Sequence, residues 1–283
     1  GLLSVGDALD FSGAYAQDTE YLVWKELSES LATYLRLFKH ETWFPKFQAY
    51  IQRLYKAVMA DLTWETRSSD LDITTNFRRD VIAMLSWAKD PAVVAEAAAR
   101  FEKAIAAPAS LHPDLRGIVY STFVRNATPD QADEAFTFLQ NVHATSDFIE
   151  DKLRVFATIG RFQSEALKTR ALDWAVEHVR SQDIQSVFAS VAADGQPLAW
   201  NYVQAQWDKL TAKYSGIVVG RILCASVGPF QTDEAAAAIE AFLDGKNTSA
   251  FASPLATTLE NIRTKAAMYA RDVGPMEAWI NSL

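Results

Sequence analysis

Cysteine is almost absent from this sequence, since Cys224 is the only one among 283 residues. A single cysteine excludes a disulfide within the chain. It also favours a reducing compartment, so we expect a cytoplasmic location. Basic residues are fewer than acidic ones, 27 against 35, and the net charge is −8. Because an acidic chain repels phosphate backbones, we do not expect nucleic-acid binding.

Long apolar runs are also missing. No stretch approaches the roughly 20 apolar residues that a membrane-spanning helix needs, so we expect no membrane span in this chain. Residues 1–7 (GLLSVGD) contain neither the basic start nor the small-residue cleavage site of a signal peptide. We therefore interpret this start as that of a chain entered partway through a longer protein.

The usual signatures of catalysis are absent. None of the four histidines forms a His-Glu-x-x-His zinc motif: His40 and Glu41 begin one, but Phe44 stands where the second histidine belongs. The sequence also lacks a Gly-x-Ser-x-Gly nucleophile motif and the glycine-rich phosphate loops. Cys224 lies in an apolar helical context, which is typical of an inert core thiol. We expect no metal site and no catalytic residue in this chain.

Amphipathic helices are what the sequence has in abundance. Residues 197–210 are the clearest example, because Trp200, Val203, Trp207 and Leu210 step by three, four and three and so share one helix face. Most of the eight tryptophans recur at such spacing and are expected in the core. We predict helices over residues 4–14, 18–39, 42–61, 73–88, 91–106, 113–125, 129–143, 146–159, 163–178, 180–192, 196–213, 217–226, 232–244, 254–271 and 273–282.

These helices define the expected fold class. Isolated helices of this length are marginal in water, so each needs a neighbour on its apolar face. Many helices of about 11 to 18 residues, joined by short turns, favour an all-α, HEAT/armadillo-like superhelical stack of antiparallel helix pairs. We expect residues 1–283 to form one such domain. The repeat is too degenerate to give a fixed period, and a compact helical domain that is not a solenoid stays open.

Arginines are the remaining candidates for a binding site. Each is either a solvated or ion-paired surface residue, or an inward-facing cation whose planar fork holds a ligand carboxylate. The arginines in question are Arg78, Arg79, Arg125, Arg161 and Arg221.

Several short motifs, taken together, resemble the C-terminal helical domain of the M1 zinc aminopeptidases, in the branch of the puromycin-sensitive, glutamyl and endoplasmic-reticulum enzymes. They occur in the family's order over nearly the whole chain. Thr63 replaces the glycine of the family's Leu-Gly-Trp motif, and Gln206 replaces an asparagine. The motifs are GLLSVGDA (1–8), YLVW (21–24), LTWE (62–65) with FRR (77–79), LRGIVY (115–120), VRSQD (179–183), and PLAW with WDKL within 197–210.

The resemblance implies a function for a chain without its own chemistry. In this family the zinc and the substrate motif lie in an upstream catalytic domain, which would be this chain's partner, so the chain alone is expected to be inactive. The C-terminal domain caps the active-site chamber and contacts the distal part of peptide substrates. By position, Tyr34 and Arg161 resemble residues that bind the peptide. Two alternatives stay open: a stand-alone helical-repeat scaffold that binds a partner protein on its concave face, and an unrelated all-α enzyme.

Overall fold

The computed structural model describes residues 4–283, so Gly1, Leu2 and Leu3, which begin the first motif, lie outside the described residues. Residues 4–283 contain helices and turns and no β-strand, which confirms the all-α prediction. The helices are α1 (Val5–Gly13), α2 (Tyr21–Leu37), α3 (Phe44–Leu62), α4 (Asp72–Trp87), α5 (Pro91–Ala106), η1 (Pro108–Ser110), α6 (Pro113–Asn126), α7 (Pro129–Thr145), α8 (Ile149–Thr158), α9 (Glu165–His178), α10 (Ile184–Ala192), α11 (Leu198–Ala205), α12 (Trp207–Lys213), α13 (Gly216–Val227), α14 (Asp233–Leu243), η2 (Ser249–Phe251) and α15 (Ala252–Ser282).

The helix starts follow from local sequence. Prolines occupy the first position of α5, α6 and α7, where a missing N–H costs nothing. Side chains satisfy free N–H groups at other starts. Asp90 Oδ1 accepts from the Val93 N–H at 3.0 Å, and Thr232 Oγ1 accepts from the Ala235 N–H at 3.2 Å. These ends agree with the boundaries that the sequence predicts.

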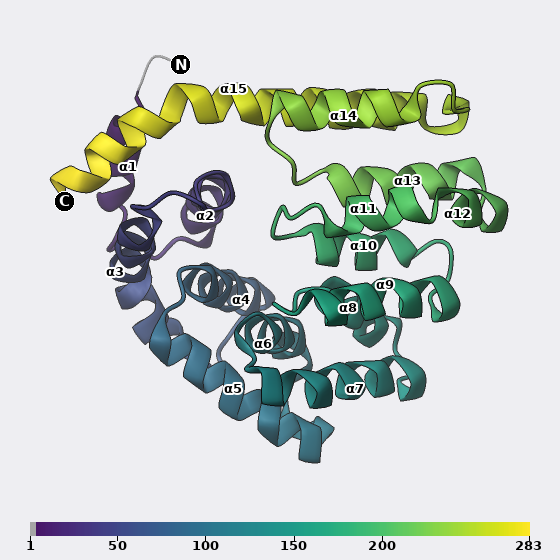
Figure 1. Cartoon of the computed structure of the whole chain (residues 1–283). Coiled ribbons are helices and arrows are strands. Elements are labelled where there is room, and N and C mark those ends of the chain that lie inside the picture. Colours follow the sequence, from purple (N-terminus) through teal and green to yellow (C-terminus); the bar gives the residue numbers. More distant parts are fainter. Residues whose placement is uncertain (1–3) are drawn as a thin grey trace.

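Two predictions of where one helix ends and the next begins were wrong, and α8 and α10 begin three and four residues later than predicted, at Ile149 and Ile184. The helix expected over 196–213 breaks at Gln206 into α11 and α12, yet Trp200 and Trp207 still share a partner, because both rings lie edge-on to Phe242 at 5.1 and 5.3 Å. Conversely, α15 continues through Pro275, where a break was expected. Its last turns pack on α1, and that packing offsets the hydrogen bond that the proline cannot make. Figure 1 shows α15 changing direction towards its C-terminus, as a proline kink requires.

The helices form two rows along a curved path (Figure 1). An inner row runs α2, α4, α6, α8, α10, α13, α15, and each member contacts the next. An outer row of α3, α5, α7, α9, α11 and α14 packs on the inner one. The last helix returns to the first, where the Trp279 Nε1–H donates to Asp10 Oδ1 at 2.7 Å. Stacked antiparallel pairs produce such rows, while a fixed HEAT or armadillo repeat stays a prediction.

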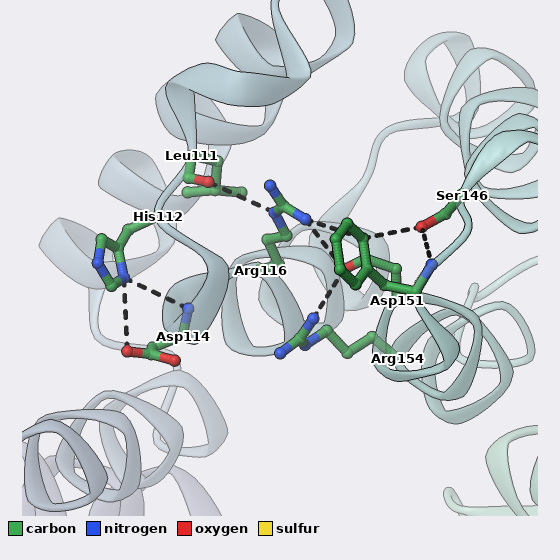
Figure 2. Close-up of polar contacts among 8 residues, drawn as sticks. Leu111, His112, Asp114, Arg116, Ser146, Asp151 and Arg154 are labelled. Atoms are coloured by element: carbon green, nitrogen blue, oxygen red, sulfur yellow. Dashed lines mark hydrogen bonds and ion pairs between the residues drawn. The ribbon is translucent and has the colours of Figure 1, made fainter. Parts of the chain in front are cut away.

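One polar network ties two members of the inner row together. Asp151 on α8 is buried, and both of its oxygens accept hydrogen bonds from Arg116 on α6, at 2.8 and 3.1 Å (Figure 2). Arg154 and Ser146 complete the shell around the same carboxylate, at 2.7 and 3.1 Å. Burial alone would raise the pKa of Asp151, but these donors and the arginine charges lower it below 3.8.

A close backbone approach ties α8 to the next inner helix. Gly160 follows α8, and its N–H donates to Ser190 Oγ on α10 at 3.0 Å. A Cβ atom at this glycine would lie 2.5 Å from the Val191 nitrogen, so only glycine allows this approach. The contact places Arg161, the next residue, beside α10.

Candidate functional site

The inner row surrounds a cavity of about 1090 Å³. Most of its lining comes from the C-terminal ends of α2, α4, α6, α8, α10 and α13, with the loops that follow them. The N-terminal ends of α3, α9 and α11 and Lys265 from α15 complete it. The helices of the inner row therefore point the same end at a common space. Each C-terminal end carries a partial negative charge from the aligned peptide dipoles.

Cations dominate the charged lining of this cavity. Seven lysine and arginine side chains line it, against two carboxylates, Glu165 and Asp194. The whole chain has the opposite balance, with a net charge of −8. Basic residues have therefore been gathered here from helices far apart in the sequence. They are Arg36, Lys39, Lys89, Arg125, Arg161, Lys168 and Lys265.

Three of the lysines hold the walls of the cavity together. Lys168 forms an ion pair with Asp194, and Lys39 donates to the carbonyl oxygen of the same aspartate. Lys265 donates to the Gly228 carbonyl at the end of α13. Burial lowers the pKa of both Lys39 and Lys265, because a charged ammonium is costly away from water. These contacts satisfy helix and loop carbonyls, which is a structural role.

The arginines of the cavity have no carboxylate partner. Within residues 4–283, Arg36, Arg125 and Arg161 form no ion pair with a carboxylate; Arg161 Nε donates to the Ala157 carbonyl at 2.6 Å. The guanidinium carbons of Arg36 and Arg125 lie over the Trp87 ring, 5.3 and 5.1 Å from its centroid. Such stacking orients a guanidinium and leaves its N–H edge free for another partner.

Two of these arginines also repel each other. Burial, and then the charge of neighbouring Arg161, lowers the pKa of Arg125 from 12.5 to about 9. Burial also lowers the pKa of Arg161. Two cations held together without an anion are a feature that a bound carboxylate would relieve. The cavity is therefore suited to an anionic ligand with carboxylate chemistry.

The structure separates the two residues that resemblance suggests for peptide binding. Arg161 lines the large cavity, whereas Tyr34 lines a smaller one of about 580 Å³ between α1 and α2. The Tyr34 ring stacks on Phe38 at 5.9 Å. Burial, followed by the nearby charge of Asp272, raises its pKa, so Tyr34 keeps its hydroxyl proton at neutral pH.

The other arginines singled out in the sequence have different surroundings. Arg78 is buried, pairs with Asp70 at 2.5 Å and donates to the Leu62 carbonyl at 3.2 Å, which is a structural role at the end of α3. Arg79 and Arg221 are exposed and lie outside the cavity lining. Sequence reasoning thus found Arg125 and Arg161 but missed Arg36 and the four lysines. Only the stacking of Arg36 on a tryptophan 51 residues away marks it, and no local pattern predicts that contact.

A metal site does not fit the described part of the chain. Among residues 4–283, no group of three or more histidine, cysteine, aspartate or glutamate side chains could hold a metal ion. Zinc sites need at least three protein ligands of these types. No helix among the same residues is both long and apolar enough to cross a membrane.

Comparison with known proteins decides the family. A family model described as the ERAP1-like C-terminal domain matches residues 1–264. The chain belongs to this family. Its curated relatives are named as aminopeptidases. Aminopeptidase 2 of Candida albicans is 22% identical over 291 residues, covering 100% of this chain and 31% of the relative.

Two further relatives have the same proportions. Glutamyl aminopeptidase of Bitis rhinoceros is 25% identical over 274 residues, covering 93% of this chain and 28% of the relative. Aminopeptidase M1 of Arabidopsis thaliana is 21% identical, covering 93% of this chain and 30% of the relative. The chain thus spans about a third of the length of the aminopeptidases that it matches. The match to the family model confirms the family that the sequence motifs indicate.

Proposed function

We propose that this chain is the non-catalytic C-terminal domain of an M1-type zinc aminopeptidase, that residues 1–283 form one domain, and that it caps the active-site chamber. Its basic cavity receives the distal, carboxyl-terminal part of the peptide substrate. The observation that carries this proposal is the cluster of arginines without carboxylate partners in a cavity built by most of the inner row. Membership of the ERAP1-like C-terminal domain family supports the assignment to an aminopeptidase.

The arginine side chains supply the recognition chemistry. A guanidinium presents parallel N–H donors that match both oxygens of a carboxylate, and such charged pairs are about twice as strong as neutral hydrogen bonds. Arg161 and Arg125 hold the peptide's terminal carboxylate in this proposal. Tyr34 lines the small cavity, and in this proposal it contacts another part of the same peptide through its protonated hydroxyl.

Docking against a catalytic domain would also cover apolar surface. Phe11 and Leu22 line the small cavity and are 63% and 66% exposed, although large apolar side chains are stabilised by burial. A second domain that closes over a site excludes water and orders the substrate. Zinc and bond cleavage belong to that second domain, since the described residues of this chain lack a metal-ligand set. The single cysteine, half-buried Cys224, supports a cytoplasmic location for the parent.

Calorimetry on the 283-residue chain tests the peptide-binding role. A nonapeptide with neutral side chains is titrated as the free acid and as the C-terminal amide. We expect the acid to bind at least about tenfold more tightly, since one charged hydrogen-bonded pair is worth about 1.5–3 kcal/mol. Arg161→Gln should remove most of that preference. Arg170→Gln is the matched control, because Arg170 pairs with Asp133 outside the cavity.

Two outcomes contradict the proposal. Equal affinity for the free-acid and amide peptides would show that the cavity does not bind the terminal carboxylate. Hydrolysis of an aminoacyl reporter by the chain in the presence of zinc would show that it is itself catalytic.

A further inference from the structure

The charge of the large cavity exceeds what one carboxylate can neutralise. Seven cationic side chains against two carboxylates leave an excess of five positive charges. Six helix C-termini face the same space, those of α2, α4, α6, α8, α10 and α13. Each contributes about −0.5 elementary charge, or roughly −3 together, while the N-termini of α3, α9 and α11 line the same cavity and contribute roughly +1.5. At least about three positive charges then remain to be balanced by a ligand.

The arginines likewise call for more than one carboxylate. Arg36, Arg125 and Arg161 have no carboxylate partner among the described residues. A single carboxylate has two oxygens and can accept from two guanidinium groups, as Asp151 does from Arg116 and Arg154, so the three arginines need at least two carboxylates. A peptide with neutral side chains brings only its terminal carboxylate, so it leaves cationic N–H edges without a charged partner in a partly buried site. N–H groups that have lost water and gained no partner destabilise the complex by the free energy of their lost hydration.

Trp87 determines where two of these cations lie. The Arg36 and Arg125 guanidinium carbons lie 5.3 and 5.1 Å from its ring centroid, and they come from helices α2 and α6 on either side of α4 in the inner row. Gln48 Nε2 donates to the Trp87 carbonyl at 3.1 Å and holds this end of α4. Trp87 therefore acts on a ligand through the two arginines.

We infer that the cavity selects peptides with a second carboxylate at their carboxyl end, that is, aspartate or glutamate at the last position or the one before it. This inference rests on the proposed function and names the substrate class of the same site. The terminal carboxylate pairs with Arg161 and Arg125, and the acidic side chain pairs with Arg36. Trp87 is a positioning residue that holds the second pair in register. The cavity walls also include apolar Leu35, Phe44 and Leu198, which suit a peptide better than a small inorganic anion.

Three nonapeptides that differ only in the last residue test the inference, all as free acids. With glutamate, glutamine and lysine at that position, we expect the glutamate peptide to bind the chain at least about tenfold more tightly than the glutamine peptide. The lysine peptide should bind more weakly than both. The glutamate preference should decrease as salt is raised from 50 to 500 mM, because screening weakens charge pairing.

Variants assign the preference to named residues. Arg36→Gln should reduce the glutamate-to-glutamine ratio below about threefold and leave the acid-over-amide preference in place. Trp87→Leu should reduce the same ratio and also weaken the acid-over-amide preference, because Arg125 stacks on the same ring. Trp87→Tyr retains an aromatic face and should keep both. Arg263→Gln is the control, because Arg263 pairs with Glu240 on the surface. Melting temperatures of all variants show whether a changed ratio arises from unfolding.

The outcomes separate this inference from the proposed function. Equal binding of the glutamate and glutamine peptides, together with an intact preference for acid over amide, would overturn the inference and leave the proposed function standing. Loss of both preferences would overturn both. Displacement of the glutamate peptide by an equal concentration of inorganic phosphate would also overturn the inference, because it would make the cavity a small-anion site.

Discussion

Asp151→Asn is the most informative test of how the inner row is held together. Asparagine keeps the size of aspartate but removes its charge and turns one acceptor into a donor that faces a guanidinium. The wild-type carboxylate is 5% exposed and accepts from Arg116, Arg154 and Ser146. Removing one partner of a buried ion pair costs about 3–5 kcal/mol. The two arginine side chains keep 22% and 27% of their exposure, so water offsets part of this cost.

We therefore expect the variant to lose about 3 kcal/mol of unfolding free energy, near the low end of that range. At about 2–4 °C per kcal/mol for chains of this size class, the melting temperature should fall by about 6 °C or more. Circular dichroism at 222 nm measures the transition. Asp133→Asn is the control, since that carboxylate is 77% exposed in its pair with Arg170 and should contribute less than about 0.5 kcal/mol.

The unfolding free energies of wild type and Asp151→Asn, compared over a range of pH, give a second check. The pKa of Asp151 is lowered in the folded state, so its contribution is complete above the unfolded value of about 3.9 and is lost as the pH falls through the folded pKa. The difference between wild type and Asp151→Asn should therefore be large at pH 7 and shrink below about pH 4. A difference that is small at pH 7, or equally large at pH 3, would refute the reasoning.

Three further predictions concern the cavity and its walls. Gly160→Ala places a Cβ 2.5 Å from the Val191 nitrogen and should cost about 2 kcal/mol in urea unfolding. Gly117→Ala, within α6 and in ordinary contact only with the Arg154 side chain on α8, should be neutral or stabilising, and the reverse order would contradict the close approach of α8 to α10. Because burial raises the pKa of Cys224, iodoacetamide should label it slowly at pH 7.5 and rapidly in urea, and rapid labelling of the native chain would place this thiol at the surface. Burial lowers the pKa of the cavity residues Lys39 and Lys265, so peptide affinity should be constant at neutral pH and fall at alkaline pH as these lysines lose their protons. An affinity that rises there would refute the attraction of the cavity for a carboxylate.

The sequence predicts the helices of this protein better than its site. The sequence shows where several helices start, because the groups that cap them lie only a few residues apart. Examples are the caps Asp90 and Thr232 and the prolines at the first position of α5, α6 and α7. The continuity of α15 through Pro275 could not be predicted in this way, because it depends on packing against α1, which lies some 270 residues earlier. Local propensity opposes the observed helix there, and tertiary contact decides.

The cavity was hidden for a related reason. Most of its cations, such as Arg36, Lys89, Arg125 and Arg161, lie at or just after the C-terminal end of a helix, where a basic residue is ordinary because it complements the helix dipole. Only the common direction of the inner helices brings these ends together, so a chain with a net charge of −8 encloses a basic cavity. Family resemblance indicated Arg161. Arg36 and Lys265 line the same cavity, but only the three-dimensional structure shows that they do.

Photo-crosslinking tests most directly whether the cavity receives the carboxyl end of a peptide. A nonapeptide with a benzophenone side chain at its penultimate position and a free carboxylate is irradiated with the 283-residue chain, and the adducts are mapped by mass spectrometry. We expect adducts on cavity segments around Trp87 and residues 160–168, and we expect Arg161→Gln to suppress them. Adducts confined to the outer-row helices α5, α7 or α14 would contradict this expectation.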